Sequence, residues 1–517
     1  MKIFNISILF CLLLTVSSCV KFDEFYSSED FPGDEIGSST YNLELVLSEG
    51  YRFWSQAVVK EHLADANVIC DITEANLEGD FVGAYRAKYD YSRLDFKNDN
   101  MWEDAYKSIN QANHILAITD ADNQIDNIFE SQRARMRGEA AFLRAYNHFL
   151  LLRYYAKQYT ASTANTDAGI ILRTTPAEDF STGGRSSVAE GYALVLEDLE
   201  LAIASLPENF SSNDHGTFPA YQFRANKFDA VSLKARVLLQ MNDIDEALEV
   251  VSSLIGKPNT APEFPAWAPA GLKMATGDGV LDLFRSESLA AGSELRTYVA
   301  NYAISEPFTL MERIKLMANG VQSSIYLKDS FSEMYLDDKG DFLNSDTLRL
   351  RNFIKEVVVE NEAGVATDTT FIYQKFSLTT GINTNWPTIR LAELLLMRAE
   401  LLAVRGGSSA ALKDLNLLRS LRGAQTVAGA PNPAEVLELV IRERMLELVG
   451  EGERFFHWKR MGAYNATVSD IYPESVYAPF SRTDQADIRW DSPQTLFRLP
   501  VNEINRNPDL SEADQNP

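Results

Sequence analysis

Residues 133–156 read RARMRGEAAFLRAYNHFLLLRYYA, and this stretch decides the fold class. Ala141, Ala145, Phe149 and Leu152 recur at spacings of three and four residues, the period of an α-helix with one buried face. The alanines are small enough to let a neighbouring helix approach closely. The stretch therefore predicts a long helix that packs against other helices.

The same periodicity continues on both sides of this helix. It predicts further helices over residues 42–66, 102–119, 187–206, 226–240, 243–255, 388–405, 408–422 and 433–450. Asp243 follows a tight turn at Met241 and Asn242 and is a good N-cap for the helix after it. We therefore expect a predominantly all-α fold on tetratricopeptide-like helix pairs.

Two segments depart from the helical pattern. Residues 256–385 are crowded with proline and glycine at their start, and short strand-like pieces lie near 280–284 and 371–376. Residues 463–495 are aperiodic and rich in aromatic side chains. The sequence thus predicts helical blocks at about 100–255 and 388–450, with long irregular insertions at 256–385 and 463–495.

The amino terminus has the features of an export signal. Met1-Lys2 precede a mostly apolar run at residues 3–16, which is too short to span a bilayer and suits a secretory signal peptide. Residues 16–19, Val-Ser-Ser-Cys, resemble a bacterial lipobox. We expect a signal peptide at 1–18, a lipidated Cys19 with a tether at 19–40, and one domain over 41–517. An ordinary signal peptide with a coincidental cysteine is the alternative.

Composition and motifs exclude several classes of function. The net charge of −25 would repel a phosphate backbone, which argues against nucleic-acid binding. The five histidines show no zinc-binding spacing, and no CxxC pair, nucleophile elbow, P-loop or dinucleotide fingerprint is present. We therefore expect no catalytic residue, metal or cofactor. Pairs of carboxylates meet by chance among 73 acidic residues, so a glycosidase stays open on this criterion.

Two predicted helices carry charge where apolar side chains are expected. The first places Arg390, Glu393 and Glu400 in a helix that is apolar nearly all round, and the second ends where Gly450 and Gly452 break it. The charged residues of the second segment are Glu443, Arg444, Glu447, Glu451 and Arg454. One interpretation is an active site. We favour a structural ion-pair network, because no His, Cys or Ser nucleophile accompanies these charges.

An ordered series of blocks resembles the SusD/RagB family. The blocks are Trp102 to Tyr106 with Ala112-Asn113, then residues 139–146, 230–239, 386–400, 412–422 and 443–455 with Arg460, and the end of the chain from Leu499-Pro500 to Gln515-Asn516-Pro517. They span nearly the whole chain after the tether. Departures occur at His457, where the family usually has Asp, at Arg498, and in a missing terminal Gly-Tyr.

The resemblance implies a fold on four tetratricopeptide-like helix pairs and a lipid-anchored protein on the outer face of an outer membrane. There it would cap a SusC-like, TonB-dependent transporter and bind an oligosaccharide or another nutrient. A surface glycosidase and a tetratricopeptide-type interaction module without glycan binding are the alternatives. The family's motifs are scaffold, so no binding residue carries over.

Aromatic residues in irregular segments are the candidate ligand-binding residues. A sugar has apolar C–H faces and a polar rim, which suits an aromatic surface flanked by hydrogen-bonding groups. We select Tyr91, Trp267 and Tyr298 on this ground. Packing of each ring beneath its own loop is the competing interpretation. If these residues fail, Tyr472, Tyr477 and Trp490 come next.

Overall fold

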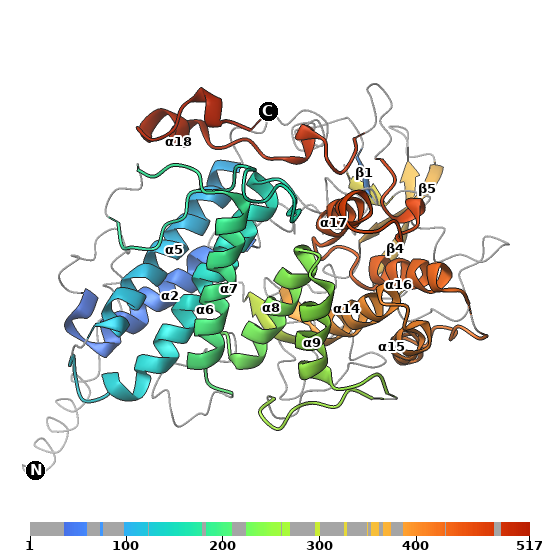
Figure 1. Ribbon diagram of the computed structural model, residues 1–517, viewed down its shortest axis with the longest axis horizontal. Helices are drawn as coiled ribbons and strands as arrows, with labels where there is room; N and C mark the ends of the chain where they lie inside the picture. The colour runs from blue at the N-terminus through green and yellow to red at the C-terminus, as the bar shows by residue number, and fades with distance from the viewer. Residues whose placement is uncertain are drawn as a thin grey trace, which may run out of the picture.

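The computed structural model describes most of the predicted helical blocks and parts of the insertions (Figure 1). The described residues are 36–58, 73–75, 98–121, 124–177, 182–208, 224–259, 261–268, 295–299, 325–327, 349, 353–360, 366–373, 386–429, 431–479 and 488–516. Eleven α-helices lie within these ranges, which confirms the mostly helical fold class. In this part of the chain no helix is both long and apolar enough to cross a membrane.

The helices follow one another as packed neighbours. Their bounds are α2 Thr40–Gln56, α5 Asn98–Asp120, α6 Phe129–Tyr155, α7 Val188–Ser205, α8 Lys227–Gln240, α9 Ile244–Ile255, α14 Leu391–Val404, α15 Ser408–Leu421, α16 Pro433–Glu447, α17 Arg454–Thr467 and α18 Val501–Arg506. Helix α6 packs against α5 and α7, α8 against α9, and α14 against α15. Helices α8 and α9 join the two halves, because α8 contacts α7 while α9 contacts α14 (Figure 1).

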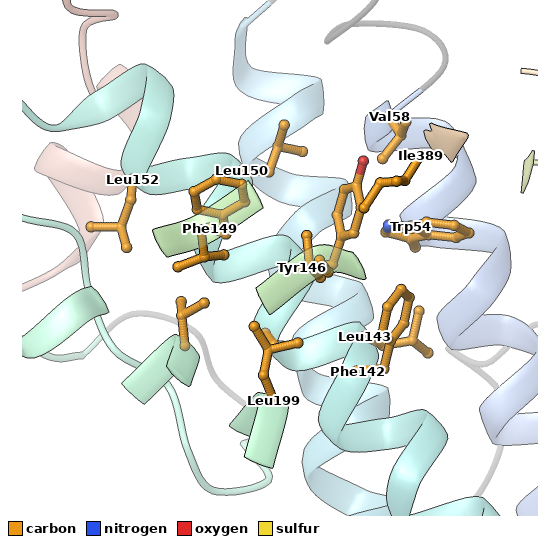
Figure 2. Close-up of a cluster of buried hydrophobic side chains, with 14 of the residues drawn as sticks. Trp54, Val58, Phe142, Leu143, Tyr146, Phe149, Leu150, Leu152, Leu199 and Ile389 are labelled. Atoms are coloured by element: carbon orange, nitrogen blue, oxygen red, sulfur yellow. The ribbon is translucent and has the colours of Figure 1, made fainter. Parts of the chain in front are cut away.

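Helix α6 lies at the centre of the larger core. Trp54 of α2 meets Tyr146 of α6 edge-on, with ring centroids 5.2 Å apart, and also contacts Phe142 (Figure 2). Ala141 and Ala145 are fully buried, as their small size in the sequence predicted. Close approach of α5 and α7 to this helix buries most of its surface.

Local capping signals fix the helix pair formed by α8 and α9. Asn226 begins α8 with a capping box, in which its side chain accepts from the backbone of Asp229 and the Asp229 carboxylate accepts from Asn226. The predicted cap at Asp243 is confirmed, since its carboxylate accepts from the backbone N–H of Glu246. Between the helices Asn242 takes a left-handed conformation with φ of +61°.

Short antiparallel strands occur in the long insertion, and β1, which precedes it in the chain, joins one of their sheets. One sheet has the strand order β1-β3-β5-β4, with β1 Thr73–Ala75, β3 Ile325–Leu327, β5 Ala366–Tyr373 and β4 Ile354–Glu360. A second pairs β2 Leu295–Val299 with β6 Trp386–Arg390. The strand expected at 371–376 overlaps β5, whereas the one expected at 280–284 lies outside the described residues.

Two boundaries in the second helical block differ from the sequence prediction. The helix expected over 388–405 begins only at Leu391, because residues 388–390 pair with β2 as part of β6. The region expected to be irregular from 463 instead begins inside α17. Every residue from 455 to 464 of α17 is buried, so the helix is covered on all sides and shows no amphipathic period to read.

Candidate functional site

The structure places the three aromatic candidates in different settings. Tyr91 lies outside the described residues. Tyr298 was expected in a loop but belongs to strand β2, where its backbone stands opposite Pro387 of β6. A register irregularity between Thr297 and Tyr298 interrupts that pairing. Of the three candidates, only Trp267 and Tyr298 lie within the described residues, in separate segments of the chain.

Trp267 is half-buried beside the first turn of α8. Its ring centroid lies 6.1 Å from that of Phe228, and the Lys227 ammonium lies 5.2 Å from the ring. Phe264 packs against Phe228 in the same way, at 6.5 Å. Part of the Trp267 ring therefore packs against the core. The rest of the side chain is exposed, so its role in ligand binding stays a prediction.

The aromatics held in reserve have mainly packing roles. Tyr472 is buried, and its hydroxyl donates to the Glu400 carboxylate at 2.7 Å. Trp490 lies against Gly462 of α17, where a Cβ atom would stand only 2.2 Å from the indole ring. Tyr477 accepts a hydrogen bond from the Asn465 amide at 3.1 Å.

A buried group of charges surrounds Glu447 at the end of α16. We call it the Glu447 cluster; its members are Arg349, Arg390, Arg422, Glu443, Glu447 and Glu451. Glu447 Oε1 lies 2.7 Å from Arg390 Nη1 and 2.8 Å from Arg422 Nη2. Arg390 also reaches Glu451 at 2.8 Å, and Arg349 reaches Glu443 at 2.7 Å. Because Arg390 ends strand β6, the cluster joins this strand to α16 and α15.

Electrostatics in this cluster favour the charged forms. Burial raises the pKa of Glu447, but the guanidinium groups of Arg422 and Arg390 lower it more, so the pKa lies well below its ordinary value. Gly450 and Gly452 have φ of +79° and +81°, as expected where the helix ends. The turn that they form lets Glu451 fold back onto Arg390.

A second buried group links α14 to α8, α16 and α17. Glu393 pairs with Arg236 at 2.5 Å, and Glu400 pairs with Arg460 at 2.5 Å. Arg444 lies 3.5 Å from Glu393, and its Nη2 lies 2.9 Å from His457 Nε2. Burial and the neighbouring Arg444 charge lower the pKa of His457 well below its ordinary value, so the imidazole stays neutral.

Sequence reasoning identified the acidic members of these groups better than their partners. Arg454, predicted as a member of the ion-pair network, donates to the Val476 carbonyl at 3.0 Å. Its neighbour Glu453 was missed, although it is buried and accepts from Arg153 at 2.9 Å. Arg422 was missed as well. Arg422 continues the buried series of Leu415 and Leu418 in α15, so a charge at that position is the signal that would have found it. Glu453 stands at the N-cap of α17, where no helical period points to it.

The two buried charge groups are better suited to stabilising the fold than to catalysing a reaction. The charges are closed off from solvent and paired with one another, and the histidine among them is held neutral. Within the described ranges no set of three His, Cys, Asp or Glu side chains is arranged to hold a metal ion. The structural role of these residues stays a prediction, which stability measurements can test.

An open groove lies where α8 turns into α9, beside the ends of α14 and α17. It consists of two adjoining depressions of about 480 and 710 Å³, which share Asp243, Asp245 and Arg405. Tyr159 and Tyr464 line the smaller depression. This groove was not predicted from the sequence, because its residues come from four segments far apart along the chain.

Two family models match the chain in separate parts. A model described as "SusD family" matches residues 326–517, and one described as "Starch-binding associating with outer membrane" matches residues 34–239. Together they cover both helical halves. No curated protein shows significant similarity to the sequence.

Solved structures share the whole fold at low sequence identity. A SusD superfamily protein from Bacteroides thetaiotaomicron is 21% identical, with a TM-score of 0.70 over 93% of this chain and 100% of that chain. A putative sugar-binding protein from Bacteroides vulgatus is 20% identical, with a TM-score of 0.69 over 93% and 98%. A laminarin-binding SusD-like protein is 19% identical, with a TM-score of 0.62 over 93% and 99%.

Proposed function

The chain belongs to the SusD/RagB family, and from this premise we propose that it is an outer-membrane lipoprotein that binds an oligosaccharide and caps a SusC-like, TonB-dependent transporter. The observation that carries the proposal is the match of both helical halves to family models, one of which describes starch binding at the outer membrane. The lipobox-like residues before Cys19 support the membrane anchor.

Glycan binding without turnover is the central part of the proposal. The carboxylates of both charge groups are buried and paired with arginines, so they are poorly placed to act as the acid and nucleophile of a glycosidase, which favours a binding protein. One matching family model is described as starch-binding and one structural relative as laminarin-binding, so maltoheptaose and laminarihexaose are the first probes. We expect calorimetric binding of at least one probe and no release of shorter sugars on prolonged incubation. Release of shorter sugars would instead favour the glycosidase.

The ligand-binding site is tested at Trp267, with Phe264 as its matched control. Both side chains are half-buried and pack on Phe228, so alanine at either position removes similar core contact. Trp267→Ala should weaken glycan affinity by about tenfold, the scale of one lost aromatic contact, while Phe264→Ala should leave it unchanged. Equal loss in both variants would show a packing role. Tyr91→Ala, measured in parallel, should weaken binding as well.

The transporter partnership has its own test. Gentle detergent extraction of the outer membrane should yield the protein together with a large β-barrel transporter. Recovery of the protein only as a free monomer under these conditions would count against the capping role, and glycan binding would be unaffected by that result.

A further inference from the structure

The groove beside α9 has two tyrosines held in fixed positions. Tyr159 meets Tyr192 edge-on at 5.2 Å, and Tyr464 meets Tyr472 edge-on at 5.4 Å. Tyr192 and Tyr472 are buried, so each groove tyrosine is braced from the core. Rings that are already fixed lose little conformational entropy when a ligand contacts them.

The side-chain oxygen of Asn242 is a hydrogen-bond acceptor without a partner among the described residues. Its amide Nδ2 donates to the Arg460 carbonyl at 3.2 Å, whereas its buried Oδ1 atom has no hydrogen-bond partner within the described part of the chain. A buried acceptor without a partner is costly, and a ligand hydroxyl would satisfy it. Asn242 lines the smaller depression from the turn between α8 and α9, where its backbone takes a left-handed conformation uncommon for a residue other than glycine.

The charges around the groove limit the class of ligand. Four carboxylates and two cations line the larger depression: Asp243, Asp245, Glu246, Glu249, Lys234 and Arg405. Asp245 pairs with Arg405, and Lys234 pairs with Glu246 at 2.8 Å, which leaves an excess of negative charge. The excess carboxylates would repel an acidic sugar in the groove. A neutral sugar would meet the same carboxylates as acceptors for its hydroxyl groups.

We propose that this groove is a second binding site, for the end of a neutral saccharide, separate from the site predicted around Trp267. The half-buried Tyr159 would contact the C–H face of one sugar ring, the buried Tyr464 would form the wall behind it, and Asn242 Oδ1 would accept from a hydroxyl group. A volume of about 480 Å³ in the smaller depression lies within the usual range for small-molecule sites, about 300–1,000 Å³.

The valines of the groove serve as local reporters of binding. Val404 and Val468 line the smaller depression, and Val468 is 61% exposed. In methyl-labelled protein, maltoheptaose or laminarihexaose should shift both valine signals to saturation in the millimolar range or tighter. Oligogalacturonide of similar length should bind more weakly. Silent valines with both neutral probes, or equal affinity for the acidic probe, would overturn the proposal.

Three variants locate the binding. Val468→Arg should block the groove, and Val501→Arg, at an exposed valine of α18, is its control. Asn242→Gly removes the amide while glycine accepts the φ of +61° without strain. Read at Val404, both groove variants should weaken the affinity by about tenfold, and the control should not. Unchanged affinity in both groove variants would overturn the site.

The site predicted around Trp267 and the proposed groove site can be tested independently of each other. In Trp267→Ala the groove shifts should persist, whereas their loss would show a single continuous site and overturn the proposal of two. If calorimetry shows glycan binding but the Val404 and Val468 signals do not shift, the proposed function stands and the groove is not a binding site.

Discussion

Glu447→Ala tests whether the buried charges hold the scaffold together. The variant leaves Arg390 and Arg422, each within 2.8 Å of the carboxylate, without their main counter-charge, and Arg349 at 3.7 Å loses part of its own. Removal of one partner from a buried ion pair costs about 3–5 kcal/mol, and three cations place this case near the upper end. We therefore expect a loss of about 4–5 kcal/mol in the free energy of unfolding.

Thermal unfolding is the assay for this loss. An unfolding entropy of about 2.1 cal/mol/K per residue amounts to about 1 kcal/mol/K over the 517 residues, so Tm should fall by about 4–5 °C. Glu438→Ala is the control, because Glu438 lies on the exposed face of the same helix. Its effect should stay within about 0.5 kcal/mol. A Glu447→Ala protein with native Tm but no glycan binding would refute the structural role.

The charge of Glu447 also gives a pH signature. Its pKa is lowered in the folded state, so its stabilising contribution is present above the ordinary value of 4.5 and is lost as the pH falls below that value. Glu447→Gln preserves the shape of the side chain and cannot titrate. Its stability should therefore depend less on pH below 4.5 than that of the wild type. If the free energy of unfolding of both proteins falls equally with pH below 4.5, the lowered pKa of Glu447 is contradicted.

Three further predictions concern the anchor and two buried bases. Cys19→Ala should release the protein from the membrane fraction, and continued retention would refute the lipid anchor. Burial lowers the pKa of His148 from 6.5 to about 3, so wild-type stability should fall as the pH drops through this window, and His148→Leu should flatten that fall in urea titrations. Burial lowers the pKa of Lys459 from 10.5 to about 7, so the wild type should gain stability as the pH rises between these values; a Lys459→Met protein with the same gain would contradict this.

Local signals explain why part of the fold was predictable. The pair α8 and α9 begins next to Asn226 and Asp243, both of which cap a helix with their own side chains. Such signals lie within one turn of the boundary and can be read from a single sequence. Helix α17 has no comparable signal, because Glu453 at its N-cap makes no side-chain capping bond and the helix is buried on several faces. Its boundaries therefore depend on tertiary packing.

The pairing of the buried charges was beyond the reach of the sequence. A charge at a core position shows that a partner is needed, which is how Glu393 and Glu447 were found. The partner itself is set by the three-dimensional arrangement: Arg153 lies 300 residues from Glu453, and Arg236 lies 157 residues from Glu393. The groove around Asn242 poses the same problem, because four chain segments contribute to it.

The blocks that carry the family resemblance are the parts of the chain least able to reveal its ligand. Arg144, in the block at 139–146, pairs with Asp198 at 2.6 Å, and the blocks at 386–400 and 443–455 contribute most of the buried charge groups. Loss of one such partner costs about 3–5 kcal/mol, a large fraction of the stability of a typical domain, about 5–15 kcal/mol. Those positions are therefore constrained by folding whatever sugar is bound. A half-buried residue such as Trp267 carries a smaller folding cost, so the choice of ligand can change there while the helical scaffold stays the same.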